Sequence, residues 1–170
     1  MIKDIIISII QFLILDFCQI FLLNNIYFLG FINPMIYIWF IILLPFVTPK
    51  WLVLLSSFLL GVSIDIFSAD TGINAFVCVF VGFLRPALLN AFSGNIDNTS
   101  YLRPSLSSLG FKNFFFFTAS TVFIHHLLYF AIDIFSFAEI MQVLARTLLS
   151  SVVTIILILL LDMIFFKRSE

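Results

Sequence analysis

Polar side chains recur at helical spacing inside long apolar stretches of this chain, and their types are the ones that could do chemistry. Residues three or four positions apart share one face of a helix. Four stripes of this kind are Ser57, Gly61 and Asp65; Asn74, Cys78 and Gly82; Thr118, Thr121 and His125; and Gln142, Arg146, Ser150 and Thr154. Asp16 and Gln19 form a further pair one turn apart. An ionisable group inside lipid costs several kcal/mol, so the charged members need a structural or functional reason.

Asp65 and Arg146 allow two interpretations. We expect both in the outer half of the membrane, where they could form an ion pair that locks two helices together. Alternatively, they line an outward-facing polar cavity with His125 at the same depth. The small residues are expected to let helices approach closely, and this packing motif comprises Ser57, Gly61, Gly72 and Gly82.

The remaining polar groups also have structural explanations beside functional ones. Asp16 is expected near mid-depth, as part of a proton pathway or as a structural hydrogen-bonding group. His125 is either a hydrogen-bonded packing residue, or a ligand or proton relay. Arg85 is expected to extend its charge to the inner membrane interface.

The sequence contains no recognisable catalytic constellation. His125 and its neighbour His126 point about 100° apart on a helix, so they do not form a ready metal site. Gly-x-Ser-x-Gly and phosphate-binding glycine motifs are both missing from the sequence. We therefore expect no enzymatic activity, no metal and no cofactor. The net charge of −1 and the lack of a basic cluster argue against nucleic acid as a partner.

These residues are carried by apolar segments of membrane-spanning length. Hydrophobic residues make up 63% of the 170 residues and charged residues 10%, against about 25% charged residues in soluble domains. A bilayer core of roughly 30 Å needs about 20 apolar residues in a helix. The sequence predicts one domain, 1–170, an all-α integral membrane protein with six transmembrane helices at about 5–23, 31–47, 51–67, 73–91, 113–132 and 140–166.

The distribution of charge predicts the topology. Lys and Arg residues between the predicted helices occur only in the second and fourth gaps, and others flank the two ends of the chain, whereas the first, third and fifth gaps have none. The positive-inside rule then places both termini in the cytoplasm. The longest connection, 92–112, is polar and is expected to be a cytoplasmic loop. Asn33 and Pro34 are expected to open the second helix as its N-cap and first-turn proline.

One region resembles the signature of a known family. The segment FLLGVSIDIF, 58–67, is followed by Thr71-Gly72 and then by Gly82-Phe83-Leu84. This resembles the pattern of MreD, a family of bacterial rod shape-determining proteins: a Gly-Leu-x-x-Asp segment, a short turn with Leu-Gly and an apolar helix. Gln19 and Pro34 also fit that pattern. The chain departs from it at Val62 and Thr71, where the family has leucine.

The resemblance extends over the whole chain in length, hydropathy and span order. The composition and the His125-His126 pair are similar to those of the family members found in Bacteroidetes-type bacteria. It implies a non-enzymatic component of the cell-elongation machinery in the bacterial inner membrane. The implied partners are membrane lipid, an MreC-like single-span protein, the MreB filament indirectly, and the elongation glycosyltransferase and penicillin-binding transpeptidase. MreD also resembles the substrate-binding subunits of energy-coupling-factor transporters. The alternative is therefore a small-molecule (vitamin-like) binding or transport subunit with an outward-facing polar pocket.

Overall fold

The computed structural model describes residues 2–25, 32–68, 72–92 and 102–166. Its elements are α1 (Ile2–Phe21), η1 (Leu23–Asn25), α2 (Ile38–Leu43), α3 (Lys50–Ser68), α4 (Ile73–Phe92), α5 (Leu106–Ile134), η2 (Phe137–Glu139) and α6 (Ile140–Phe165). Five of the helices, α1, α3, α4, α5 and α6, are long and apolar enough to cross a membrane. These helices confirm the prediction of an all-α architecture and indicate a multi-pass membrane protein.

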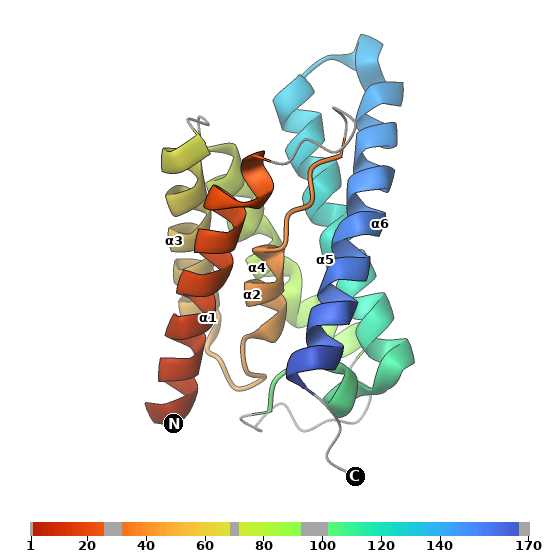
Figure 1. Ribbon diagram of the computed structural model, residues 1–170. Coiled ribbons are helices and arrows are strands. Elements are labelled where there is room, and N and C mark those ends of the chain that lie inside the picture. Colours follow the sequence, from red (N-terminus) through yellow and green to blue (C-terminus); the bar gives the residue numbers. More distant parts are fainter. Residues whose placement is uncertain (1, 26–31, 69–71, 93–101, 167–170) are drawn as a thin grey trace.

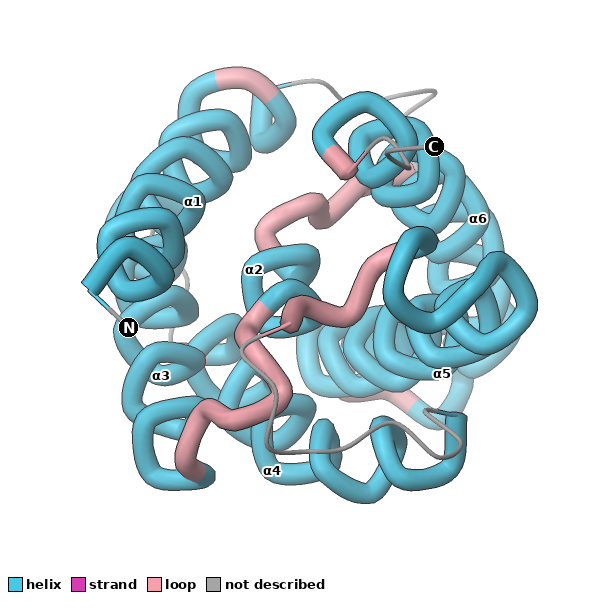
Figure 2. Tube along the Cα trace, turned by 90° about the horizontal axis from the view of Figure 1, so that it is seen from below, coloured by secondary structure: helices cyan, strands magenta, loops and turns pink. Residues whose placement is uncertain are grey.

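The long helices surround a short central one. Viewed along the helix axes, α1, α3, α4, α5 and α6 follow one another around α2 (Figure 2). Sequential neighbours pack together, since α3 lies against α4, α4 against α5 and α5 against α6. The beginning of α1 and the end of α6 lie at the same end of the bundle (Figure 1). We call this the termini end, and the other end, where α3 leads into α4, the turn end.

The predicted second helix, 31–47, is wrong as a continuous helix. Only Ile38–Leu43 form α2, and residues 33–35 before it are not helical, so Asn33 and Pro34 do not open a helix. Non-helical backbone at membrane depth is tolerated only where protein satisfies its polar groups. Side chains of α1 and α6 do so here, through bonds from Asn33 N to Ser150 Oγ (3.0 Å), Met35 N to Thr154 Oγ1 (3.1 Å), Ile36 N to Gln19 Oε1 (3.0 Å) and Gln19 Nε2 to Pro34 O (3.2 Å).

Two arginines bind the carbonyl groups at the C-terminal end of α2. Arg85, only 2% exposed, donates to the carbonyl oxygens of Ile42 (3.5 Å) and Leu44. Arg103 donates to Leu43 O (3.3 Å). Cations are favourable at a helix C-terminus because its carbonyl groups are unpaired and the helix dipole is negative there. Arg85 therefore points into the bundle, and the expectation that it extends to the membrane interface is wrong.

Arg103 also ties the bundle to α1. Its guanidinium donates to Gln11 Oε1, to Asp4 O (3.0 Å) and to Ser8 Oγ (3.0 Å). Burial lowers the pKa of Arg103 below its ordinary value, while the nearby Asp4 carboxylate acts in the opposite direction. One side chain from the connection before α5 thus holds both α1 and α2.

The fifth helix begins earlier than the sequence predicts. Instead of 113–132 it spans Leu106–Ile134, and the predicted loop 92–112 therefore includes its first turns. Ser105 is the N-cap in a capping box with Ser108, which satisfies the first free amides. Gly110 adopts φ +75° and interrupts the helix, so residues 106–112 form a kinked helical segment, while residues 93–101 of the predicted loop lie outside the described part of the chain.

Candidate functional site

Asp65 caps the helix that follows its own. Its carboxylate oxygens accept hydrogen bonds from Asn74 N (3.0 Å), Asn74 Nδ2 (2.9 Å) and Ala75 N (2.8 Å), in the first turn of α4. The first amides of a helix have no partner within the helix, and the dipole there favours negative charge. Asp65 is 6% exposed, so this arrangement supplies the compensation that a buried carboxylate needs.

A hydrogen-bonded chain leads from Asp65 to His125. The Tyr37 hydroxyl donates to Asn74 Oδ1 (2.8 Å) and lies 3.1 Å from His125 Nε2. With the Tyr37 hydroxyl proton on Asn74, the contact to His125 is a hydrogen bond in the tautomer of His125 that carries its proton on Nε2. The chain Asp65–Asn74–Tyr37–His125 thus joins α3, α4, the segment before α2 and α5. We call it the buried relay.

The buried relay accounts for two of the predicted site residues and one that the sequence did not reveal. Asp65 and His125 belong to one hydrogen-bonded network, but neither is among the described residues that line the polar cavity at this end of the bundle. Tyr37 connects them, but it lies in an apolar run where no periodic polar pattern marks it. His126 belongs to a separate contact, with Nδ1 2.9 Å from Val122 O and Nε2 3.3 Å from Thr154 Oγ1.

Gln19 organises the polar surface beside the relay. Besides holding the segment before α2, its Nε2 donates to Asn24 Oδ1 (2.8 Å), and Asn24 Nδ2 donates to Ser68 Oγ (2.8 Å). These bonds join the end of α1 to the end of α3. Gln19 is 2% exposed, and its carboxamide bonds to Pro34 O, Ile36 N and Asn24 together.

A polar cavity of about 250 Å³ opens at the turn end between these elements. We call it the outer cavity, because the distribution of charge in the sequence predicts that this end of the bundle faces out of the cell. Its polar lining consists of the carboxamides of Gln19, Asn24, Asn33 and Asn74 and the hydroxyls of Tyr37, Ser68 and Tyr129. The described lining residues include no Lys, Arg, Asp or Glu, since Asp65 lies behind Asn74. The described residues of the outer cavity therefore offer uncharged hydrogen-bonding groups.

The structure does not bring Asp65 and Arg146 together. Arg146 lies on α6, and the bonds of the Asp65 carboxylate go to α4 on the other side of the bundle (Figure 1). On α6, Arg146 neighbours Gln142. In the orientation of the Gln142 amide that satisfies both its nitrogen and its oxygen, the oxygen accepts a hydrogen bond from Arg146 (3.2 Å). Asp16, the other predicted acid, accepts from Ser63 Oγ (2.8 Å) on α3. Both acids thus join α3 to a neighbouring helix.

Three of the four predicted packing residues, Ser57, Gly61 and Gly82, lie at the contact between α3 and α4, whereas Gly72 does not. A Cβ atom at Gly61 would lie 2.4 Å from Ala75 Cα, and one at Gly82 would lie 2.6 Å from Ser57 Oγ. Glycine is required at position 61, where the neighbours are backbone atoms, whereas at position 82 the nearest neighbour is the Ser57 side chain. Gly72, with φ +89°, directly precedes α4 and has open space around it, so its backbone conformation is what favours glycine there.

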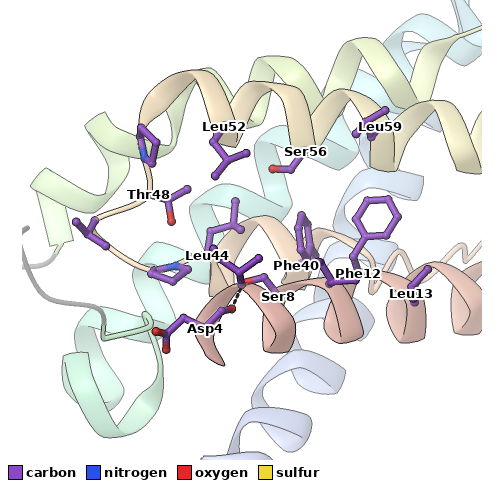
Figure 3. A pocket seen from close by; sticks show the side chains of 15 residues that line it. Asp4, Ser8, Phe12, Leu13, Phe40, Leu44, Thr48, Leu52, Ser56 and Leu59 are labelled. Carbon is purple, nitrogen blue, oxygen red and sulfur yellow. Dashed lines mark hydrogen bonds between the residues drawn. The ribbon is translucent and has the colours of Figure 1, made fainter. Parts of the chain in front are cut away.

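A second, apolar hollow lies at the termini end between α1 and α3 (Figure 3). It has a volume of about 490 Å³, and we call it the lateral groove. The side chains of Phe12, Phe40, Leu52 and Leu59 point into it (Figure 3). The hydroxyl of Ser56 bonds to a backbone carbonyl within its own helix. The lateral groove thus presents a hydrophobic surface.

Among the described residues, no group of three or more His, Cys, Asp or Glu side chains could hold a metal ion. The geometry offers a polar cavity, a buried relay and an apolar groove, which are features of binding and packing. Comparisons with protein-family models, curated proteins and solved structures found no match to the chain.

Proposed function

We propose that the chain is a non-enzymatic, MreD-like membrane component of the bacterial cell-elongation machinery. In this proposal it maintains rod shape by organising peptidoglycan synthesis in the inner membrane, with an MreC-like protein as its direct partner. The MreB filament and the elongation glycosyltransferase and transpeptidase are reached through that partner.

The observation that supports the proposal most directly is the role of the motif residues. Gly61, Asp65 and Gly82 all act in one structural unit, the α3–α4 hairpin. Gly61 and Gly82 allow the two helices to touch, and Asp65 fixes the start of the second helix. A sequence pattern that resembles a scaffold family therefore builds a rigid element.

The proposed topology has six crossings with both termini in the cytoplasm. The segment 32–49, with α2 at its centre, supplies the crossing that is not a continuous helix. Support comes from the common position of the beginning of α1 and the end of α6 (Figure 1). Two positive charges add to it: Lys50 is the first residue of α3, and Arg103 bonds to Asp4 O in the first turn of α1.

The surface offered to partners is apolar. Exposed residues of α1 include Ile9, Leu13 and Phe17, and α3 exposes Leu55 and Leu59. Between membrane helices, association depends on close packing rather than on the hydrophobic effect. We propose that α1, α3 and the lateral groove form the face that packs against the span of the MreC-like partner, because both helices leave large side chains uncovered there.

A depletion experiment tests this proposal. Depletion of the protein in its own bacterium is expected to give rounded cells, and the wild-type chain should restore rods. Leu13→Trp and Leu59→Trp, which enlarge side chains at the groove, are expected to fail in restoring rods while the protein accumulates normally. Leu160→Trp, on an exposed position of α6 away from the groove, is the matched control and should restore them. Rod-shaped cells after depletion would refute the function.

The outer cavity favours a second candidate, a small-molecule binding or transport subunit. A scaffold has no evident need for a polar cavity of about 250 Å³ at the turn end. This candidate expects an ATPase-driven partner and a bound small molecule in the purified protein.

A further inference from the structure

We infer that the outer cavity binds an uncharged, hydroxyl-bearing group of monosaccharide size. The inference names the ligand class of the second candidate and rests on that candidate, while leaving the scaffold proposal independent. It is carried by the chemistry of the cavity lining, by the groups that remain available there and by the cavity volume.

Charge is the first criterion. The described lining residues carry carboxamides, hydroxyls and apolar side chains, with no Lys, Arg, His, Asp or Glu among them. A charged ligand would lose its hydration without meeting a counter-charge, which is costly in a membrane protein. Asp65 does not change this, since its carboxylate is engaged by Asn74 and Ala75. The described lining thus favours a neutral ligand.

The groups still able to bond are both donors and acceptors. Asn33 uses its backbone N–H on Ser150, and its carboxamide makes no hydrogen bond within the described part of the chain. Asn24 gives one of its two amide protons to Ser68, and Ser68 keeps its own hydroxyl proton for donation. A hydroxyl group both donates and accepts, so it matches these neighbouring groups better than a pure donor or a pure acceptor.

Aromatic side chains complete the lining. Tyr129 and Phe67 both border the outer cavity, and Phe67 is 63% exposed. Aromatic rings provide apolar faces next to the carboxamides, which suits a ligand with C–H surfaces between its hydroxyls. The volume of about 250 Å³ corresponds to about eight water molecules at roughly 30 Å³ each, which is the scale of a single sugar ring.

A ligand in the outer cavity would also contact two residues of the buried relay. Tyr37 and Asn74 line the outer cavity and are the two middle members of the chain from Asp65 to His125. A ligand bonded at the cavity floor therefore contacts the groups that join α3, α4 and α5.

The test is ligand-observed saturation-transfer NMR on the purified full chain in nanodiscs. The probes are glucose and N-acetylglucosamine, with gluconate as an anionic and glucosamine as a cationic comparator. We expect saturation of at least one neutral sugar, and at least tenfold weaker binding of both charged compounds. Equal binding of charged and neutral probes, or no saturation of any sugar, overturns the inference. Saturation of an uncharged dipeptide but not of the sugars overturns the ligand class.

Matched variants locate the site. Asn33→Ala and Ser68→Ala are each expected to raise the Kd of the bound sugar by about three- to tenfold, the effect of losing one hydrogen bond. Asn113→Ala is the control, because Asn113 is similarly half-buried but lies near the termini end of α5. A change equal in all three variants refutes the assignment to the outer cavity. Failure of sugar binding with normal rescue of cell shape would refute this inference alone, since rod shape reports on the scaffold.

Discussion

The contact between α3 and α4 gives the most quantitative prediction, through Gly61→Ala. The added Cβ would lie 2.4 Å from Ala75 Cα, 2.6 Å from Ala75 N and 2.6 Å from Asn74 O. All three neighbours are backbone atoms, so no side chain can rotate away. Ordinary contact begins at 3.4 Å, and the helices must therefore move apart by about 1.0 Å (3.4 minus 2.4 Å).

The same movement weakens the cap of α4. The bonds from Ala75 N and Asn74 N to Asp65 measure 2.8 and 3.0 Å, and an added 1.0 Å would bring them to 3.8 and 4.0 Å. Those distances lie beyond hydrogen-bond range. Overpacking costs about 1–3 kcal/mol, and loss of a hydrogen bond to a charged group about 1.5–3 kcal/mol. We expect a total near 3 kcal/mol, because the backbone can relax in part.

The assay is thermal unfolding in detergent, followed by circular dichroism. For a chain of this length about 3 kcal/mol corresponds to a Tm lower by roughly 6–12 °C. Gly82→Ala is the internal comparison, since its nearest neighbour is the Ser57 side chain rather than backbone. Ser57→Gly should restore much of the Tm lost in Gly82→Ala and none of that lost in Gly61→Ala. A Gly61→Ala protein with unchanged Tm would refute the close contact of α3 and α4.

Three further predictions concern the Asp65 cap, the Tyr37 hydroxyl and the membrane topology. Asp65→Asn should lower the free energy of unfolding by about 2 kcal/mol, because the charged cap of α4 is lost. Adding Arg146→Ala in a double variant should not restore that stability. Thermal unfolding of the single and the double variant measures both effects. Restoration would instead support the ion pair of Asp65 with Arg146. Tyr37→Phe should cost about 1–3 kcal/mol in the same assay, because it removes the hydrogen bonds that the Tyr37 hydroxyl makes with Asn74 Oδ1 and His125 Nε2. A cysteine at exposed Ser107 should react with an impermeant thiol reagent only after the cells are opened, and labelling of intact spheroplasts would contradict cytoplasmic termini.

Helical spacing explains why part of the site could be predicted from the sequence. Gly61 and Asp65 were placed on one face by their four-residue separation, and both face α4 in the structure. The spacing says which residues share a face but not which helix that face meets. The sequence therefore allowed a pairing of Asp65 with Arg146, whereas in the structure Asp65 bonds to Asn74 at the start of α4.

The second predicted helix was wrong for a different physical reason. The periodicity of a buried apolar run does not distinguish a helix from an extended segment. The sequence 31–47 therefore did not indicate that its first part is not helical. The break is stabilised by Gln19, Ser150 and Thr154, which lie far away in the sequence. Arg85 illustrates the same limit, because its acceptors exist only after α2 has ended inside the bundle. Tyr37 had no polar neighbours at helical spacing to mark it.

The most direct test of the proposed function is purification of the tagged full chain from native membranes in mild detergent, with mass spectrometry of what accompanies it. We predict recovery of an MreC-like single-span protein together with wall-synthesis enzymes, and loss of that recovery in Leu13→Trp but not in Leu160→Trp. Recovery of an ATPase module without any wall-synthesis protein would contradict the scaffold and make the outer cavity the centre of a transporter subunit.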